Sequence, residues 1–293
     1  MNQSKESVLV TGVGGFLGSH LLPKLEKNFR VVAAPPSDKL DIRDRDKVVK
    51  LPEAQFVIHL AGIANVPLSW EDPERVISIN TIGTANILDY CVKNKASLIY
   101  PSSYAYGSPE YLPTDEKHPV KAENPYAVSK LAAESLCEVY HKKYGLNVII
   151  LRLFNVYGPG QSEEMVIPKI ILGLINRNSV EVQTGKPKRD MVFVSDVVEA
   201  FLLALRGKNG LTIYNVGSGK SYSIKEIAMK LIEISGKKSK FTDKRIPRPN
   251  DILETLANIS KIQTELGWKP KVNIDEGLEK TYSWFLTHKK IIE

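Results

Sequence analysis

The feature that most constrains this chain is the alternation of short apolar runs with longer amphipathic segments. Six runs rich in β-branched residues are typical of strands, namely VLVTG (8–12), RVVAA (30–34), FVIHLA (56–61), SLIYPS (97–102), VIILRLF (148–154) and MVFVSD (191–196). Helical stretches such as FLGSHLLPKLEKN and YAVSKLAAESLCEVYHKKYG lie between them. Apolar strands that each lead into a helix indicate a parallel sheet covered on both faces. The pattern predicts an α/β fold with a Rossmann-type, doubly wound parallel sheet, whose ligands bind at the carboxyl ends of the strands.

A glycine-rich loop follows the first of these strands. Gly12, Gly15 and Gly18 have the spacing G-x-x-G-x-x-G in TGVGGFLGSH, a variant of the dinucleotide-binding fingerprint. The first glycine permits a tight turn, the second lets a pyrophosphate approach the backbone, and the third lets helix pack on strand. The helix that opens at Phe16 and Leu17 then offers free N–H groups to the phosphates. Because the loop directly follows a strand, it favours NAD(P) binding over plain strand–helix packing.

The end of the second predicted strand bears on the choice of cofactor. In NAD-binding proteins of this fold, a carboxylate near this place holds the 2′-hydroxyl of the adenosine ribose. Here the strand ends in Ala33, Ala34 and Pro35, and Ser37 and Lys39 follow. Ser37 and Lys39 can hydrogen-bond and neutralise a 2′-phosphate, so the sequence favours NADP(H) over NAD(H). The alternative is a turn closed by two prolines, with the cofactor held elsewhere.

The pattern of the chain changes after residue 155. Residues 158–190 and 217–256 are rich in Gly, Pro and basic residues and carry shorter strands and helices. We expect residues 1–157 plus 191–216 to form the dinucleotide-binding domain. Residues 158–190 plus 217–293 are expected to form a smaller, discontinuous C-terminal lobe that binds the substrate.

Three side chains downstream have the chemistry of a hydride-transfer site. Tyr126 and Lys130 lie four apart in NPYAVSK and therefore share one helix face, while Ser102 stands at the carboxyl end of a predicted strand. A phenol titrates at about pH 10, but a neighbouring ammonium stabilises the phenolate. We predict that Tyr126 transfers the proton and that Lys130 supports it and binds the nicotinamide ribose. Ser102 is expected to hold the substrate oxygen. Such Tyr–Lys pairs are also common on solvated helix faces, and the upstream glycine loop favours the functional interpretation.

With these motifs in place, the chain resembles an extended short-chain dehydrogenase/reductase of the nucleotide-sugar epimerase, dehydratase and reductase group. The resemblance covers nearly the whole length and rests on TGVGGFLGSH, DIRD, HLAG, NTIGTANIL, PSSYAYG, NPYAVSK, LRLFNVYGPGQ, KRDMVFVSDV, YNVGSG, RPND and LGWKP. It implies an NAD(P)-dependent enzyme whose substrate is a nucleotide-diphosphate sugar. It also implies a homodimer formed by helices near residues 80–94 and 126–144. Four apolar positions there would face the partner copy or lie within one chain, namely Ile82, Ile87, Leu131 and Leu136.

The resemblance implies roles for further residues. Asp41 and Ile42 would flank the adenine. The cofactor channel would be lined by His59, Ala61, Gly62 and Asn80. Arg189 and Arg248 would clamp the substrate diphosphate, a task that suits planar guanidinium donors. The other expected substrate contacts are Ser103, Tyr104, Asn155, Val166 and Asp251. For the two arginines, a surface ion pair with Asp190 or Asp251 is the alternative.

Ser103 and Tyr104 distinguish between the reactions of this group. The 4,6-dehydratases carry an Asp–Glu pair at these two positions, so we do not expect dehydration. The region PPSDKLDIRD and the tail EGLEKTYSWF resemble GDP-fucose synthase, which epimerises C3 and C5 with a Cys and a His. The aligned residues here are Tyr104 and Met165, and neither can shuttle protons at neutral pH as Cys and His can. We therefore expect no 3,5-epimerase activity.

Two reactions at C4 of the sugar remain open. SW at 69–70, GPGQS at 158–162 and RPND at 248–251 resemble the GDP-4-keto-6-deoxymannose reductases. The missing ribose carboxylate also favours reduction of a 4-keto-6-deoxy sugar. The alternative is 4-epimerisation, as in UDP-glucose 4-epimerase. A non-catalytic dinucleotide sensor is a third reading, which the complete set of Ser102, Tyr126 and Lys130 disfavours.

Composition and targeting signals exclude several other classes. The net charge is +7, but the basic residues are scattered among acids, so the sequence does not predict nucleic-acid binding. No apolar run approaches the roughly 18 residues that span a membrane, and MNQSKES has no apolar signal core. We expect a cytoplasmic protein without a membrane partner. Cys91 and Cys137 fall in helical segments, so neither a disulfide nor a metal site is expected.

Overall fold

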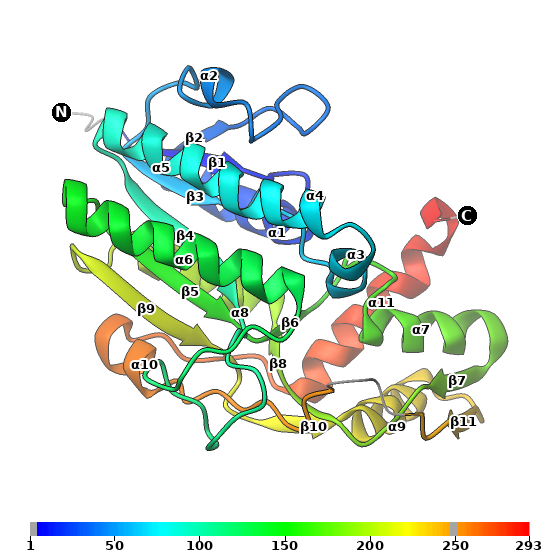
Figure 1. The fold of residues 1–293 in the computed structure, drawn as a ribbon. Helices are drawn as coiled ribbons and strands as arrows, with labels where there is room; N and C mark the ends of the chain where they lie inside the picture. Colours follow the sequence, from blue (N-terminus) through cyan, green and yellow to red (C-terminus); the bar gives the residue numbers. More distant parts are fainter. Residues whose placement is uncertain (1–4, 247–250, 293) are drawn as a thin grey trace. The chain divides into compact units, whose positions relative to one another are not determined.

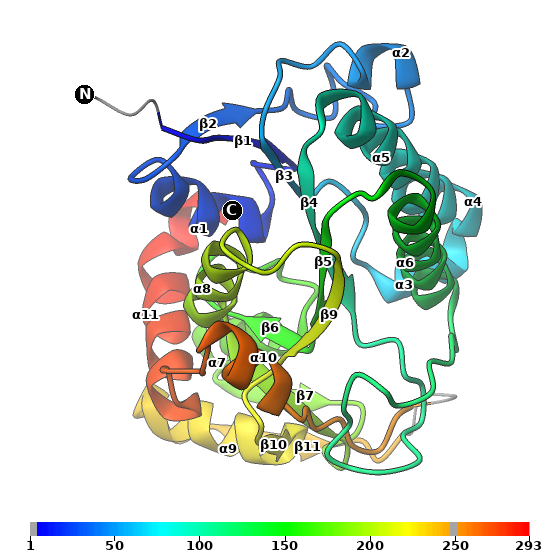
Figure 2. The same ribbon diagram turned by 90° about the vertical axis from the view of Figure 1, so that its left-hand side faces the viewer.

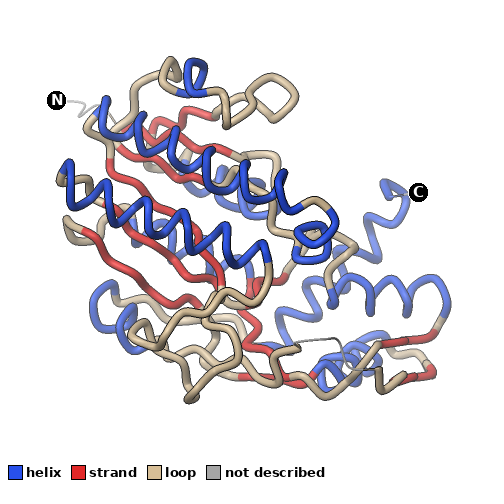
Figure 3. The backbone as a smooth tube through the Cα atoms, viewed as in Figure 1, coloured by secondary structure: helices blue, strands red, loops and turns tan. Residues whose placement is uncertain are grey.

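The computed structural model describes residues 5–246 and 251–292 (Figures 1 and 3). The chain divides into two compact units. Unit 1 consists of Met1–Gly107, Pro119–Leu153 and Val198–Tyr214. Unit 2 consists of Ser108–His118, Phe154–Val197 and Asn215–Glu293. Each unit is therefore discontinuous in sequence.

Unit 1 is built on a six-stranded sheet with the order β2-β1-β3-β4-β5-β9. Its strands are β1 (Ser7–Thr11), β2 (Arg30–Ala33), β3 (Phe56–His59), β4 (Ser97–Ser103), β5 (Val148–Leu153) and β9 (Leu211–Val216), of which β9 passes into unit 2 for its last two residues. The pairs from β2 to β5 are parallel. The chain adds β2 on one side of β1 and β3 on the other. Such a switch point is where parallel sheets bind ligands.

Helices cover both faces of this sheet (Figure 2). α5 (Gly83–Asn94) and α6 (Pro125–Tyr144) lie on one face, and α1 (Phe16–Leu25) and α8 (Val194–Ala204) lie on the other. The shorter elements are α2 (Arg45–Val48), α3 (Val66–Glu71), α4 (Pro73–Ile77) and the π-helical turn η1 (Ser78–Ile82). The prediction of an α/β fold with a doubly wound parallel sheet is confirmed. No helix in the described ranges has the length and apolar character needed to span a membrane.

Helix α6 has both of its ends encoded locally. The Asn124 side chain accepts a hydrogen bond from the Ala127 N–H at 2.8 Å, and Pro125 occupies the first helical position. Both are preferred there, because Asn satisfies an amide that has no helical partner and Pro needs none. Gly145 ends the helix with φ at +67°, a left-handed conformation that glycine adopts without strain. These signals fix where Tyr126 lies on the helix.

Some of the residues predicted at the dimer surface belong to the core of unit 1. Ile87 is fully buried among the side chains of β1, β3, β4 and β5, and Leu136 packs against the same cluster. Ile87 is therefore an interior residue and is not available to a second copy. Ile82, Val128 and Val139 remain exposed on the surface of η1 and α6.

The sixth predicted strand was placed in the wrong sheet. Lys188–Phe193 forms β8, which pairs within unit 2, and Val194 already begins α8. The sixth strand of the main sheet is β9, which the sequence analysis did not pick out. In LTIYNV polar residues interrupt the apolar ones, as expected for a half-buried strand at the edge of a sheet.

Unit 2 contains two small sheets and several helices. β6 (Asn155–Tyr157) runs parallel to β8, and β10 (Ser221–Ser223) runs antiparallel to it. β7 (Ser179–Val182) and β11 (Lys240–Asp243) form a parallel pair. The helices are α7 (Val166–Arg177), α9 (Ile224–Ser235), α10 (Ser260–Leu266) and α11 (Ile274–Ile292).

Candidate functional site

The glycine loop of unit 1 is held by close backbone contacts. Gly12 has φ at +69°, and a Cβ there would lie 2.6 Å from the backbone nitrogen of Ala61. A Cβ on Gly18 would lie 2.5 Å from the carbonyl oxygens of Gly12 and Val13. Gly15 caps α1 without a side-chain hydrogen bond, which leaves the amides of the first turn available to an anion. The geometry is the one that the fingerprint requires.

The turn after β2 presents charges of both signs. The N–H groups of Lys39 and Leu40 donate to the carbonyl oxygen of Pro36, which closes the turn. Ser37, Asp38 and Lys39 are exposed on it. Asp38, to which no motif pointed, places a carboxylate between Ser37 and Lys39, the two residues expected to receive a 2′-phosphate. The preference for NADP(H) therefore stays a prediction.

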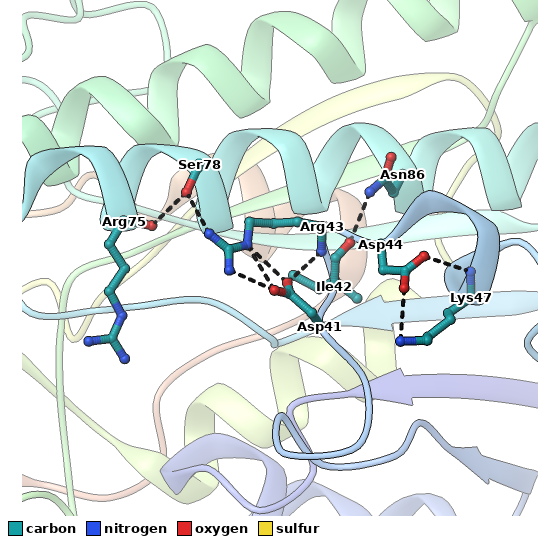
Figure 4. Close-up of polar contacts among 8 residues, drawn as sticks. All are labelled: Asp41, Ile42, Arg43, Asp44, Lys47, Arg75, Ser78 and Asn86. Carbon is teal, nitrogen blue, oxygen red and sulfur yellow. Dashed lines mark hydrogen bonds and ion pairs between the residues drawn. The ribbon is translucent and has the colours of Figure 1, made fainter.

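The residues expected to flank the adenine are fixed by Arg43 and Asn86 (Figure 4). Arg43 donates to the Asp41 carboxylate from Nε at 3.0 Å and from Nη2 at 2.6 Å. Its Nη1 donates to Ser78 Oγ on η1 at 3.3 Å. The hydrogen bonds from Arg43 lower the pKa of Asp41 to about 2. Asn86 Nδ2 donates to the carbonyl oxygen of Ile42 at 3.0 Å, so this segment is tied to both η1 and α5.

His59 contacts Thr11, the residue directly before the glycine loop. It is buried, and its Nδ1 lies 2.8 Å from Thr11 Oγ1, which also accepts the N–H of Ala61 at 3.0 Å. Burial, together with the charge of Lys130, lowers the pKa of His59 to about 3. The imidazole is therefore neutral at physiological pH. It joins the carboxyl ends of β1 and β3.

We expect stability to fall at acid pH because of His59. Its folded pKa of about 3 lies below the ordinary value of 6.5, so only the unfolded chain binds the proton between these values. This contribution is complete above about pH 6.5, and each pH unit below it costs about 1.4 kcal/mol of unfolding free energy. Urea unfolding at pH 5, 6 and 7 measures the slope. His59→Asn should flatten the slope and His20→Asn should not; equal slopes in the wild type and His59→Asn would contradict the assignment.

Asn80 connects the loop after β3 to helix α6. It lies buried in η1, and its amide exchanges two hydrogen bonds with the backbone of Ile63, at 2.8 and 3.0 Å. Its Nδ2 also donates to Ser129 Oγ at 2.9 Å, and Ser129 Oγ donates to the carbonyl oxygen of Tyr126. π-Helical turns are often found at functional sites. Asn80 therefore supports the site through the protein, and its direct contact with a cofactor stays a prediction.

Tyr126 and Lys130 lie on the first turns of α6, beside the end of β4. Lys130 Nζ donates to the carbonyl oxygen of Pro101 at 2.9 Å and lies 4.8 Å from the centroid of the Tyr100 ring. Burial lowers the pKa of Lys130 to about 8. Burial also raises the pKa of Tyr126, while the neighbouring Ser103 hydroxyl acts in the opposite direction. The helix and the strand thus bring a phenol, an ammonium and hydroxyl groups together.

Ser103, a predicted substrate contact, carries the hydroxyl group that lowers the pKa of Tyr126. Ser102 is buried, and its Oγ has no hydrogen-bond partner among the described residues. Tyr104 directs its hydroxyl to the carbonyl oxygen of Gly107 at 2.9 Å. The role of Ser102 as the third member of the set therefore stays a prediction.

One carboxylate near Tyr126 was missed from sequence. Glu123 stands three residues before Tyr126, and its Oε2 is buried without a hydrogen-bond partner in the described part of the chain. Its Oε1 lies 3.7 Å from Lys121 Nζ. The signal was an acidic residue shortly before the Tyr–Lys pair, which no motif singled out.

Of the predicted substrate residues, Asn155, Val166, Arg189 and Asp251 lie in unit 2, whereas Ser103 and Tyr104 lie in unit 1. Arg189 Nη2 donates to Asp251 Oδ1 at 2.7 Å, while Asp190 is buried and accepts from the backbone of Ser218, Gly219 and Ala257. Asp251, and not the adjacent Asp190, is therefore the ionic partner of Arg189. Asn155 and Val166 open β6 and α7, and Arg248 lies outside the described residues. Within the described ranges, no group of three or more His, Cys, Asp or Glu could hold a metal.

Comparison with known families identifies the chain. Residues 8–217 match the model of the NAD dependent epimerase/dehydratase family. The chain belongs to this family. Its members are enzymes that use a nicotinamide dinucleotide, which agrees with the glycine loop of unit 1.

Relatives of this epimerase/dehydratase family member carry out more than one reaction. This chain is 35% identical over 303 residues to a putative UDP-glucose 4-epimerase of Methanocaldococcus jannaschii. The match covers 94% of this chain and 97% of the relative. The chain is 32% identical over 295 residues to the GDP-6-deoxy-D-mannose reductase of Pseudomonas aeruginosa, covering 95% and 96%. By homology, this chain belongs with the nucleotide-sugar epimerases, reductases and dehydratases.

Solved structures give the same result. The UDP-glucose 4-epimerase of Thermotoga maritima, solved with UDP-glucose, has a TM-score of 0.90 and 30% identity, covering 98% of this chain and 100% of that chain. RMD of Pseudomonas aeruginosa, solved with NADPH, has a TM-score of 0.89 and 32% identity, covering 97% and 100%. The fold of this chain therefore matches an epimerase and an NADPH-binding protein about equally closely.

Proposed function

We propose that this enzyme reduces the 4-keto group of a 4-keto-6-deoxy nucleotide sugar, with Tyr126 as the proton donor. The observation that carries the proposal is that the two residues after Ser102, namely Ser103 and Tyr104, bear hydroxyl groups and no carboxylate. The Ser103 hydroxyl lowers the pKa of Tyr126, and the Tyr104 hydroxyl donates to the carbonyl oxygen of Gly107 at 2.9 Å. Hydroxyl groups thus stand where the dehydratases carry an acid pair, which leaves Tyr126 as the proton-transfer group.

The side chains around Tyr126 support this direction of proton transfer. Because burial raises its pKa, the phenol is protonated at neutral pH and can donate to a carbonyl oxygen. When bound, a reduced nicotinamide dinucleotide would supply the hydride to C4 and be oxidised. The carbonyl oxygen takes the proton from Tyr126, so the product is the 4-hydroxy sugar. Lys130 then stabilises the phenolate that remains, and Ser102 donates a hydrogen bond to the same substrate oxygen.

The cofactor is proposed to lie along the carboxyl ends of β1 and β3. Gly12, Gly15 and Gly18 would give the pyrophosphate access to the backbone, and the amides of Phe16 and Leu17 in the first turn of α1 would bind it. The adenine would rest against Asp41 and Ile42. Exposure of Ser37 and Lys39, with the NADPH complex of a relative, supports NADP(H) over NAD(H).

We further propose that unit 2 supplies the substrate lobe, with Arg189 as a ligand of the diphosphate. The guanidinium group already binds one carboxylate, that of Asp251, and two backbone carbonyl groups. Asn155, Val166 and Arg248 are the other proposed contacts with the nucleotide sugar.

Replacing Arg189 with Met should raise KM for the nucleotide sugar by about 10–100-fold and leave kcat nearly unchanged. The reason is that the diphosphate keeps the same distance from the reacting carbon in the ground and transition states. Steady-state kinetics measure both constants. Lys188→Met removes the exposed neighbouring charge and serves as the control. A loss of kcat without a change in KM would contradict the assignment.

Sugar 4-epimerisation is the second candidate, favoured by the likeness to the Thermotoga maritima epimerase over the whole chain. The same Tyr126 would then remove a proton from the 4-hydroxyl and return it after hydride transfer to the opposite face. The two reactions differ in their need for cofactor turnover.

The deciding experiment supplies the purified enzyme with NADPH or NADH and a panel of 4-keto nucleotide sugars. Loss of nicotinamide absorbance, with a 4-hydroxy sugar as product, is the expected result. Interconversion of UDP-glucose and UDP-galactose without consumption of NADPH would overturn the reductase proposal. Identification of any co-purifying dinucleotide tests the choice of NADP(H).

We also propose a homodimer through the outer surface of η1 and α6. Exposed Ile82, Val128 and Val139 support it, because apolar side chains on adjacent helices favour burial against a second copy. Ile87 takes no part, since it is buried in unit 1.

A further inference from the structure

A buried ion pair joins the helix of the reactive residues to strand β5. Arg152 Nη2 donates to Glu134 Oε2 at 2.6 Å, and Arg152 Nε donates to Oε1 at 3.0 Å. The side chains are only 6% and 8% exposed. This bidentate geometry is the strongest form of a carboxylate–guanidinium contact.

Tyr106 adds a third element to this pair. Arg152 Nη1 donates to the Tyr106 hydroxyl at 3.0 Å, and the guanidinium carbon lies 4.9 Å from the centroid of the Tyr106 ring. Tyr106 follows β4, four residues after Ser102. One guanidinium group, on β5, therefore binds both α6 and the segment that continues from β4. These are the elements that carry or flank the reactive residues.

Glu134 of this ion pair lies on the same face of α6 as Lys130. The two residues are four apart on α6, so their Cβ atoms lie about 5–6 Å from each other on one helix face. A buried ion pair rarely adds stability, because desolvation offsets the attraction between the charges. The pair therefore calls for an explanation other than strength of the fold.

We propose that Glu134 is a positioning residue that keeps Lys130 in its charged form, and that Arg152, itself bonded to Tyr106, holds the Glu134 carboxylate in place. The proposal deepens the proposed function, because a charged Lys130 is what supports the phenolate of Tyr126. It explains why a carboxylate is retained at a site where burial disfavours it.

The surroundings of Lys130 show why an added anion matters. Burial acts first and lowers its pKa, while Glu134 and Cys137 act in the opposite direction. The groups that contact Lys130 or act on its charge are His59 on β3, Tyr100 and Pro101 on β4, and Glu134 and Cys137 on α6. His59 is neutral and burial keeps the Cys137 thiol protonated, so Glu134 is the only full negative charge in this set.

The test measures the pKa of Lys130 without any substrate or cofactor. Acetic anhydride labels only the neutral amine, so labelling rates at a series of pH values, read from the Lys130 peptide by mass spectrometry, give its pKa. The variants are Glu134→Gln and the double variant Glu134→Gln/Arg152→Met, in which no buried charge is left unpaired. Glu138→Gln is the control, because Glu138 lies on the same helix and forms an exposed pair with Lys142 at 2.7 Å.

We expect the pKa of Lys130 to fall by about one pH unit in both Glu134 variants and to stay unchanged in Glu138→Gln. An unchanged pKa in the folded double variant would overturn the proposal. A double variant that does not fold, as judged by circular dichroism, would overturn it too, because the pair would then serve the fold. Failure of the proposed function shows separately, as an absence of turnover in an enzyme whose Lys130 titrates as expected.

Discussion

Tyr126→Phe is expected to lower kcat by about 10²–10⁴-fold, the usual contribution of a positioned general acid. Only the phenolic oxygen is lost, and the ring keeps its half-buried place on α6. The fold and the dinucleotide affinity should therefore stay nearly unchanged. Single-turnover measurements with the reduced cofactor and a 4-keto sugar separate the chemical step from binding.

The control for this variant lies on the same helix. Tyr144→Phe removes a phenol from the exposed end of α6, where it faces solvent, and should leave kcat as it is. Equal activity of the Tyr126→Phe variant and the wild type would rule out Tyr126 as the proton donor.

Gly18→Ala is expected to abolish tight dinucleotide binding. The new Cβ would lie 2.5 Å from two backbone carbonyl oxygens, those of Gly12 and Val13, and neither can move without opening the loop. Overpacking of this kind costs about 1–3 kcal/mol of folding free energy. The loop that would face the pyrophosphate is displaced at the same time. Fluorescence titration with NADPH and thermal unfolding measure the two effects.

The same loop offers a matched substitution. A Cβ on Gly14 would meet nothing within 4 Å, and its φ lies outside the left-handed region. Gly14→Ala should therefore bind the dinucleotide nearly as the wild type does. If Gly14→Ala and Gly18→Ala impaired binding equally, close packing would not be the reason for glycine at position 18.

The main sheet was predictable because its inner strands are continuous apolar runs. β1, β3, β4 and β5 are paired on both sides and covered on both faces, so their side chains are almost all buried. β9 lies at an edge and mixes polar with apolar residues, and periodicity alone did not reveal it. MVFVSD was recognised as a strand, but its partner depends on contacts that are distant in sequence.

The site was predictable where one helix or one turn sets the geometry. The spacing of Tyr126 and Lys130 fixes their common face, and the glycine spacing fixes the loop. Ser102 was predicted to belong to the reacting set and Ser103 to contact the substrate, but this order depends on the register of β4, because neighbouring residues of a strand point to opposite faces. The Glu134–Arg152 pair spans 18 residues between a helix and a strand, and only the folded chain brings its members together.

The division into two units has a consequence for genetic dissection of this enzyme. The chain passes between them at 107–108, 118–119, 153–154, 197–198 and 214–215, and both α8 and β9 straddle a boundary. No single cut yields either unit as a continuous polypeptide. Deletion mapping would therefore report on folding and not on the separate roles of the two units. Chimaeras with relatives would have to exchange several segments at once, so new specificities are more readily reached by point substitutions than by domain shuffling.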